Sequence, residues 1–420
     1  MFGHTAIVIN SINAIKDLNL GSSNMFNNRP VWLKTMCKSL DPGIAFNSVD
    51  DYLENRRFLV NNLKKRGMGK SGLEPLVLQE AEKLIAHLSS KQALDPARVL
   101  GNYTSNNFML MCFGKRWDYE DPEYDTFHKS VMRYLEISVI LTIGDMVPLL
   151  WYFPQMKRLY DECFELIGGI RNFYEKYIDE KLNTEDDSDE VDIISDYLRI
   201  HKNFDDTERE NLLNICQGLF VAGTDTTAAT LGFAIIHLIH HPEIQEELFD
   251  ELDAVLQGRD PSMSDIQSLS LMEGTVSEVL RINPNAPLPV HATKDPAALR
   301  SYIIPGNTLV LLNAYHINND PEHFPHPTSF NPHRWLNSEG RFRSELVELT
   351  ATFGMGKRVC PGRPLAKMEM FLLLVKLVKT FVLSVPEGHS KPDPFLKGAG
   401  VIIPPDPFTL QVKRRDGKRN

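Results

Sequence analysis

The spacing of apolar residues along this chain of 420 residues predicts a protein built mainly from helices. Apolar positions recur every three or four residues over long stretches, and the longest such pattern runs from Thr207 to His241. A second pattern follows from Leu365 to Phe381. Near the start, alternation over His4 to Ile9 predicts a strand, and helical spacing around Ile12 to Leu18 predicts a short helix. We expect that strand to pair with an earlier one.

Other strand patterns are short and widely separated. Residues Ser301 to Asn313 alternate around Pro305-Gly306-Asn307 and predict a β-hairpin. Strand-like runs also occur between Phe381 and Val412, whereas Asn183 to Asp192 is acidic enough to predict a solvated surface loop. The expected fold class is mainly α, with small β-sheets in the N-terminal, middle and C-terminal parts. No Gly/Ser or Pro linker divides residues 1–420, which predicts a single domain.

Composition and charge narrow the class of protein. The chain is 42% hydrophobic and 24% charged, as ordinary globular proteins are, and its net charge of −10 argues against nucleic acid as a partner. The apolar stretch Gly218 to Ile239 carries Asp225, so no segment is predicted to span a membrane or to act as a signal peptide. The cysteines are scattered and lack C-x-x-C spacing, which predicts neither disulfides nor a zinc site; they are Cys37, Cys112, Cys163, Cys216 and Cys360.

Candidate chemistry is concentrated in the turn from Phe353 to Gly362. Its single cysteine, Cys360, lies among glycines and basic residues just before a helical pattern. Positive side chains and the free N–H groups of a helix start both favour a thiolate, and glycines let the backbone approach something large and flat. We interpret Cys360 as a ligand. The competing interpretation is a buried structural thiol in a glycine turn.

A second candidate site lies in the middle of the longest helical pattern, at Ala222-Gly223-Thr224-Asp225-Thr226-Thr227. Ala222 and Thr226 are one turn apart on one helix face and Gly223 borders them, which leaves space beside a flat cofactor. Asp225 points about 100° away and suits a route for protons from water. The alternative is a helix crossing that needs small residues.

Together these motifs resemble the cytochrome P450 haem-thiolate monooxygenases. The haem-ligand loop of that family, F-x-x-G-x-R-x-C-x-G, is matched by Phe353, Gly356, Arg358, Cys360 and Gly362. Three further family motifs occur in the expected order: A-G-x-D-T-T at 222–227, E-x-x-R at 278–281, and P-x-R-F at 332–335, where Trp335 replaces the usual Phe. The stretches 67–71 and 113–119 look like the animal microsomal branch that handles drugs, steroids and fatty acids. The implied fold is the cytochrome P450 fold.

The resemblance implies a role for each candidate residue. Cys360 would be the ligand of the iron of haem b, Thr226 would hold and protonate the activated dioxygen, and Asp225 would relay protons to it. Glu278, Arg281 and Arg334 would form a structural network behind the haem. The remaining cofactor contacts implied by the family motifs are Arg358, Arg56, His291, Tyr52, Ala222, Gly223, Phe353 and Gly362.

Three of these contacts would hold the haem propionates, namely Arg56, His291 and Arg358. Tyr52 stands where the family usually has Trp, and a phenol can still donate one hydrogen bond. Two plainer interpretations remain open. Arg56 could belong to a solvated basic helix face, and His291 could be a neutral surface histidine.

The function implied by the resemblance is insertion of one oxygen atom of O2 into a lipophilic small molecule: a steroid, fatty acid or xenobiotic. No nucleotide-binding motif is visible, so electrons would come from NADPH through NADPH-cytochrome P450 reductase, with cytochrome b5 as a second donor. An acidic partner would dock on a basic face. The cations expected to form that face are Lys357, Arg358, Arg363, Lys367, Lys376 and Lys379.

Family members of the microsomal branch lie on the cytosolic face of the endoplasmic reticulum membrane and begin with an anchor helix and a proline-rich hinge. We expect peripheral membrane contact here too, and a truncated or alternatively started chain. Three alternatives stay open: a haem-binding electron-transfer or sensor protein, an inactive truncated form, and an isomerase that needs no reductase. The Asp225 and Thr226 pair argues against the first and the third.

Overall fold

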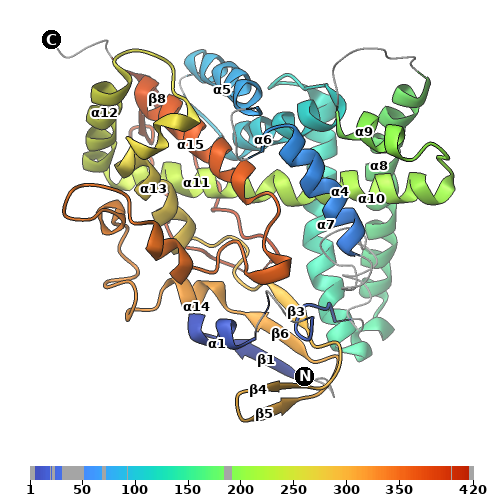
Figure 1. Ribbon diagram of the computed structural model, residues 1–420. Helices are drawn as coiled ribbons and strands as arrows, with labels where there is room; N and C mark the ends of the chain where they lie inside the picture. Colours follow the sequence, from blue (N-terminus) through green and yellow to red (C-terminus); the bar gives the residue numbers. More distant parts are fainter. Residues whose placement is uncertain are drawn as a thin grey trace.

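The computed structural model describes residues 5–18, 20, 24–30, 52–68, 72–91, 93–183, 192–398 and 400–415 (Figure 1). Helices make up most of this part of the chain, which confirms the predicted fold class. They are, in chain order, α1 (Ile12–Asp17), α4 (Tyr52–Lys65), α5 (Glu74–Ser89), α6 (Pro96–Phe113), α7 (Pro122–Met146), α8 (Pro154–Asn183), α9 (Ile193–Ile200), α10 (Asp206–Gly223), α11 (Asp225–His240), α12 (Pro242–Leu256), α13 (Ser270–Ile282), α14 (Ala314–Asn318) and α15 (Arg363–Thr380). Short 3-10 helices are η1 (Pro148–Tyr152), η2 (Met263–Gln267), η3 (Pro332–Trp335), η4 (Ser344–Leu349) and η5 (Gly356–Arg358).

The described strands form three small sheets. One has the order β1 (Ala6–Ile9), β6 (Leu309–Leu312), β3 (Val290–Ala292), with β1 parallel and β3 antiparallel to β6. A second joins β2 (Ala93–Leu94), β8 (Leu410–Arg414) and β7 (Phe381–Ser384). The third is the hairpin of β4 (Ala297–Leu299) and β5 (Tyr302–Ile304).

Helix starts follow the local sequence closely. Asp95, Asp121, Asp192 and Asp205 each precede a helix, and each carboxylate accepts a hydrogen bond from a backbone N–H of the first turn. These carboxylates satisfy donors that have no partner inside the helix. At the other end, α6 stops at Gly114, which takes the left-handed conformation that glycine adopts without strain.

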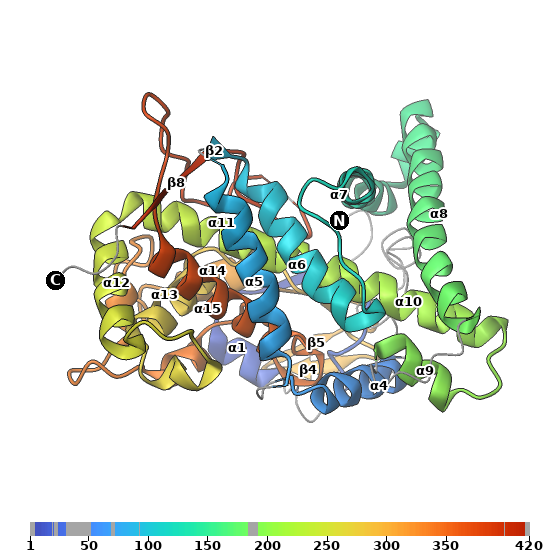
Figure 2. The ribbon, with the colours of Figure 1, turned by 90° about the horizontal axis from the view of Figure 1, so that it is seen from above.

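The helices α10 and α11 form the central axis of the molecule. In both views they cross the protein from α12 on one side to α8 on the other (Figures 1 and 2). By length and composition this 35-residue segment, Asp206–His240, could span a membrane, but 67% of its most apolar window is buried inside the protein. We therefore describe it as a core helix, packed against α6, α13 and α15.

One strand prediction was wrong, and another stays a prediction. The strand β1 lies at the edge of its sheet and pairs on one side with β6, some three hundred residues later in the chain; pairing of its other side with an earlier strand stays a prediction. The predicted hairpin over Ser301 to Asn313 does not exist, because β5 pairs with β4 and β6 pairs with β1 and β3. The true hairpin turns one strand earlier, at Arg300, which has a positive φ of 53°. The acidic loop predicted over Asn183 to Asp192 lies largely outside the described residues.

Candidate functional site

The cysteine loop is held by its own backbone. Cys360 is half-buried, and its N–H donates to the carbonyl oxygen of Phe353 at 2.8 Å, which closes the loop just before α15. The Phe353 ring lies under the guanidinium of Arg363, 5.7 Å from ring centroid to guanidinium carbon. A Cβ placed on Gly362 would lie 3.9 Å from the Cys360 sulfur, an ordinary contact. The loop therefore presents Cys360 from a fixed frame.

The glycines of this loop differ in how closely other atoms approach them. A Cβ on Gly356 would lie 2.4 Å from the backbone of Leu20, and Gly356 has a φ of +69°. Glycine is needed there because Leu20 packs against it, and Leu20 accepts a hydrogen bond from the Lys357 N–H at 3.0 Å. Gly354 has open space around it, with its nearest contact at 3.8 Å. The interpretation that Gly356 makes room for a flat ligand was therefore wrong.

The pKa of Cys360 corrects another expectation. Burial raises the pKa of this thiol, and that effect outweighs the hydrogen bonds from the N–H groups of Gly362 and Arg363 and the charges of Arg56 and Arg363, all of which lower it. The surroundings alone thus do not favour the thiolate, contrary to the sequence interpretation. A coordinated metal ion deprotonates a thiol outright, so a ligand role for Cys360 does not depend on the protein lowering this pKa.

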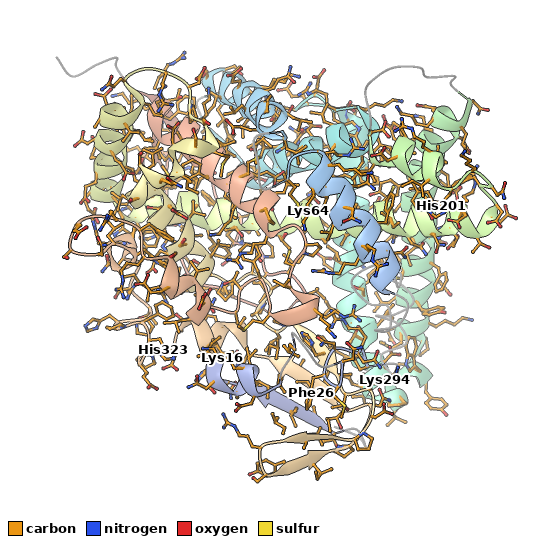
Figure 3. All side chains as sticks on the ribbon, in the orientation of Figure 1. Lys16, Phe26, Lys64, His201, Lys294 and His323 are labelled. Carbon is orange, nitrogen blue, oxygen red and sulfur yellow. The ribbon has the colours of Figure 1, made fainter. Side chains whose placement is uncertain are left out.

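The basic residues expected at the propionates converge near this loop. Arg56 of α4 donates to the carbonyl oxygen of Val359 at 2.8 Å, and Arg358 donates to that of Asn27 at 2.9 Å. His291 of β3 bonds the carbonyl oxygen of Phe26 at 3.0 Å and is only 2% exposed, so it is not a surface histidine. Figure 3 labels Phe26 close to the β1 sheet.

His291 lies in a positively charged neighbourhood. Burial is the main cause that lowers its pKa to about 3, and the charges of Arg29 and Arg358 lower it further. His291 is therefore neutral at physiological pH. Arg29 was missed by the sequence interpretation, because a single arginine in a loop carries no signal until the fold brings it beside His291. The side chain of Tyr52 lies outside the described residues, so the prediction made for it stays a prediction.

The small-residue segment lies where the central helix is interrupted. The regular helix α10 ends at Gly223 and α11 starts at Asp225, with Thr224 between them. The Thr226 hydroxyl donates to the carbonyl oxygen of Ala222 at 2.7 Å, and the side-chain amide of Asn285 donates to the carbonyl oxygen of Thr226 at 2.5 Å. Side chains that bond helix carbonyls in this way favour bends and breaks.

One face of this segment is open. Ala222 and Gly223 are exposed although they lie in the central helix, and a Cβ on Gly223 would meet no atom within 4 Å. Thr226 is half-buried next to them. Exposed small residues at the centre of a protein indicate a space beside them that is shaped for another group. A tight helix crossing, the competing interpretation, would place atoms close to Gly223.

Asp225 lies on a different face of the same helix. It is 8% exposed, and its Oδ1 lies 3.3 Å from Nε2 of His128, a residue of α7. An apolar cavity of about 530 Å³ adjoins both residues. The sequence interpretation named Asp225 but missed His128, because the two residues are far apart in the chain and His128 belongs to no motif.

The Glu278 carboxylate is completely buried. Arg281 donates two hydrogen bonds of 2.8 Å to the Glu278 carboxylate, and Arg334 donates one of 3.0 Å. The Trp335 indole N–H adds a further bond of 2.9 Å. The exchange of Phe for Trp therefore adds a donor to the carboxylate as well as filling space, which the sequence interpretation missed.

The two candidate sites are joined by α15. This helix begins directly behind Cys360 and packs against α11 and α5. Its Glu369 is 3% exposed and has the Asn107 amide of α6 and the Thr227 hydroxyl of α11 beside it. Burial is the main cause that raises the pKa of Glu369 to about 8. The turn after Thr226 is thereby tied to the helix that follows the cysteine.

Comparison with known proteins decides the family. The family model named Cytochrome P450 matches residues 1–412. The chain belongs to the cytochrome P450 family. Human Cytochrome P450 2U1 is 30% identical over 429 residues, which cover 98% of this chain and 78% of that protein. The Steroid 17-alpha-hydroxylase/17,20 lyase of Squalus acanthias is 28% identical over 433 residues, which cover 99% of this chain and 84% of that protein.

As a cytochrome P450, the protein is a monooxygenase whose cofactor is haem b, held through a cysteine thiolate. The residues present fit this group. Cys360 lies in a fixed loop, the space beside Gly223 is open, and basic side chains gather near the loop. Among the described residues no cluster of three or more His, Cys, Asp or Glu could hold a metal ion, and haem iron needs only one protein ligand here.

Three lysines of the basic face predicted for this cytochrome P450 are engaged within the protein. Lys376 is 8% exposed and pairs with Asp260 at 2.6 Å and Glu82 at 3.2 Å. Lys379 is bonded to the carbonyl oxygens of Gly258 and Arg259, and burial lowers the pKa of Lys367. These lysines stabilise the fold and do not present a common charged surface.

Exposed cations are found on α4 instead. Arg57, Lys64 and Lys65 are exposed there and line a hollow shared with His201, the residue after α9. Figure 3 labels Lys64 on α4 and His201 beside α9. Because Arg56 of the same helix contacts the cysteine loop, this basic surface of α4 adjoins the site of Cys360.

Proposed function

We propose that this cytochrome P450 inserts one oxygen atom of O2 into a lipophilic small molecule at a haem bound between α15 and the break of α10 and α11. The observation that carries the proposal is the packing of α15 against α11, with Glu369 beside Thr227. It supports a common site for Cys360 and for the Asp225 and Thr226 pair, which lie far apart in the sequence.

Residues between α15 and the break of α10 and α11 would contact different parts of the haem. Cys360 would ligate the iron, and the haem supplies the oxidising chemistry when it is bound. Arg56, Arg358 and His291 would hold the propionates, the two arginines through charge-assisted hydrogen bonds. Four further residues would lie against the haem ring and leave room for it. They are Ala222, Gly223, Phe353 and Gly362.

Thr226 and Asp225 would handle protons. The Thr226 hydroxyl is half-buried beside the open face and donates to the Ala222 carbonyl, so its oxygen can still accept a hydrogen bond. Asp225 is the first residue of α11 and precedes Thr226 directly in the chain. Asp225 would deliver protons to the activated dioxygen, and the Thr226 hydroxyl would hold the dioxygen in place by a hydrogen bond.

The absorbance spectrum of the reduced, carbon monoxide-bound protein tests the ligand. We expect the red-shifted band of a thiolate ligand in the wild type and its loss in Cys360→Ala. Cys163→Ala is the matched control, since Cys163 is buried in α8 far from the loop in sequence, and it should keep the band. A wild-type spectrum without the thiolate shift would contradict the proposal.

We also propose that electrons come from NADPH-cytochrome P450 reductase, with cytochrome b5 as a second donor, and that the reductase docks on the basic surface of α4. Replacing Arg57, Lys64 and Lys65 by Glu should lower reductase-driven turnover several-fold, because like charges slow association. Peroxide-driven turnover should remain. Lys16→Glu on α1 is the control and should change neither, whereas equal loss of both activities in the α4 variant would contradict this docking site.

The substrate class and the location belong to the same proposal. The name of the Squalus acanthias relative supports a steroid substrate, and we include fatty acids and xenobiotics in the proposed class. We propose that the protein lies at the cytosolic face of the endoplasmic reticulum membrane with peripheral contact. Exposed apolar side chains support such contact, namely Leu149, Tyr152 and Phe153 between α7 and α8, and Tyr302 and Ile303 of β5. In Figure 1, β5 and the connected ends of α7 and α8 both lie in the lower part of the picture.

A further inference from the structure

The contact between His128 and Asp225 joins two helices beside the open segment. Nε2 of His128 lies 3.3 Å from Oδ1 of Asp225, which is the first residue of α11. The side chain of His128 is 22% exposed, whereas that of Asp225 is 9% exposed. A titratable group that reaches solvent thus touches a carboxylate that is almost buried.

Tyr124 and Gly101 fix the position of the His128 imidazole. The His128 ring stacks on Tyr124, with ring centroids 5.4 Å apart and planes inclined by 23°. Across from it lies Gly101 of α6, and a Cβ there would lie 3.3 Å from His128 Nε2 and 3.0 Å from the Tyr124 hydroxyl. Gly101 therefore leaves the room that the imidazole needs to reach Asp225.

The second carboxylate oxygen of Asp225, Oδ2, is buried and has no hydrogen-bond partner of its own within the described part of the chain. A buried carboxylate oxygen without a donor costs free energy unless a further group meets it. Asp225 therefore has one oxygen on His128 and one free to exchange a proton with another group.

The cavity beside the pair is a poor conduit for water. It has a volume of about 530 Å³ and is lined largely by apolar side chains, including Met132, Leu135, Val139, Ala229 and Ile402. Apolar cavities tend to stay dry, and a water chain needs polar partners along its length.

The remaining charged residues of this lining do not provide those partners inside. Arg133 and Glu136 have side chains that are 44% and 64% exposed, and that of Asp406 is 58% exposed. These side chains are exposed to solvent, as is Asp95. The less exposed titratable groups among the lining residues are His128 and Asp225.

We propose that His128 passes protons from solvent to Asp225, in place of a chain of water molecules. In each transfer one proton enters the ring from solvent at Nδ1 while the Nε2 proton moves to Oδ1 of Asp225. The ring stays neutral in this step and the carboxylate becomes a carboxylic acid. The carboxyl group then turns about its Cβ–Cγ bond, and the same proton leaves toward the reacting site from the side where Oδ2 had been, which restores the carboxylate. The ring releases its Nδ1 proton to solvent and takes one from solvent at Nε2, so one proton in total has moved from solvent to the reacting site and no net charge accumulates. This inference rests on the proposed role of Asp225, and His128 acts only through Asp225 as a positioning residue.

The other charged groups near His128 are already engaged. Asp125 of α7 pairs with Arg98 of α6 through two hydrogen bonds of 2.8 and 3.0 Å. The Tyr124 hydroxyl is buried, and burial raises the pKa of this phenol well above its usual range. Neither residue competes with Asp225 for the proton of His128 at neutral pH.

The test replaces His128 by Gln in the haem-loaded protein. Glutamine can still bond Asp225 but cannot carry a proton. We expect a several-fold rise in the hydrogen peroxide released per NADPH consumed and a larger solvent deuterium isotope effect on product formation. Substrate affinity and the carbon monoxide spectrum should not change. Lys129→Gln, the exposed next residue of α7, should behave as the wild type.

A readout independent of turnover comes from nitrogen-15 NMR of labelled histidine in the diamagnetic ferrous carbon monoxide form. The His128 signal, identified by its absence in His128→Gln, should show the Nε2-protonated tautomer and should shift in Asp225→Asn. An unchanged signal in Asp225→Asn would overturn the inference. The exposed His316 of α14 provides an internal control.

The outcomes separate this inference from the proposed function. If Asp225→Asn releases peroxide but His128→Gln couples oxygen to product as well as the wild type, the relay is wrong and the role of Asp225 stands. If Asp225→Asn also couples normally, the proposed role of Asp225 fails as well. A rise in peroxide release without a change in the isotope effect would indicate a structural role for His128 and overturn the relay.

Discussion

At the scale of single residues, Glu278 shows how one carboxylate organises several elements. Its two oxygens accept bonds from Arg281, Arg334 and the indole of Trp335, and both Glu278 and Arg281 have side chains with no exposed area. A buried charge is tolerated only when it is paired and hydrogen-bonded. The tryptophan is therefore an electrostatic partner of Glu278 as well as an aromatic filler.

Trp335→Phe should destabilise the protein, although Phe is the usual residue of the family motif. The variant loses the N–H donor to the buried carboxylate, which is worth about 1.5–3 kcal/mol for a hydrogen bond to a charged group. Chemical unfolding of both proteins measures this difference. Trp151→Phe in η1 is the control and should cost less, since Trp151 is only half-buried. Equal losses would show that the indole bond contributes nothing specific.

At the scale of elements, α15 connects the cysteine to the rest of the molecule. Its residues from Met368 to Val378 are almost all buried, and it packs against α5, α11, α12 and α13. The buried Glu369 is the one acid in the middle of this helix, facing Asn107 and Thr227. Its protonation state therefore affects how α15, α6 and α11 fit together.

Glu369→Gln should stabilise the protein at alkaline pH and leave it unchanged at acid pH. Burial raises the pKa of Glu369 from the ordinary 4.5 to about 8. Between these two values the folded protein keeps a proton that the unfolded chain releases, so the stability of the wild type falls as the pH rises from 4.5 toward 8. Glutamine does not titrate and avoids this loss.

Thermal unfolding midpoints of the wild type and of Glu369→Gln, measured from pH 5 to pH 9, check this prediction. The two curves should coincide near pH 5 and separate progressively as the pH rises. Glu273→Gln in α13 is a useful comparison, because burial raises the pKa of Glu273 as well while the charge of Lys367 opposes the shift. Parallel curves for wild type and Glu369→Gln would contradict the assignment.

At the scale of the whole molecule, charged and apolar surfaces lie on different elements. The basic surface of α4 adjoins the cysteine loop, while exposed apolar side chains gather between α7 and α8 and on β5. Leu149 is 69% exposed and Tyr152 is 86% exposed, values that suit an apolar environment outside the protein better than water. This arrangement supports docking of a redox partner and of a membrane on separate faces.

Replacing Leu149, Tyr152 and Phe153 together by Ser should weaken binding to lipid vesicles. Each large apolar side chain contributes about 1.5–3 kcal/mol when fully buried, so partial insertion of three should be worth at least about tenfold in affinity. Sedimentation with phosphatidylcholine vesicles measures it. Ile200→Ser on α9, also an exposed apolar residue, is the control and should bind as the wild type does. Equal binding by all three proteins would contradict membrane contact at this face.

The sequence by itself determined the family, the helical class and the residues of each local motif. Cys360, the Asp225 and Thr226 pair, and Glu278 with Arg281 are each recognisable because their chemistry depends on neighbours within a few positions or one helix turn. Helix starts depend on equally local chemistry, since an aspartate before a helix acts on the first turn alone.

Only the tertiary structure decided contacts between distant segments. The pairing of β1 with β6, the burial of Lys376 with Asp260, the indole bond of Trp335 to Glu278 and the contact of His128 with Asp225 all join residues far apart in the chain. Apolar periodicity shows that a face is buried but not what covers it, and a charge run does not show which cations are already paired. The packing of α15 against α11 and the contact of His128 of α7 with Asp225 supply that information.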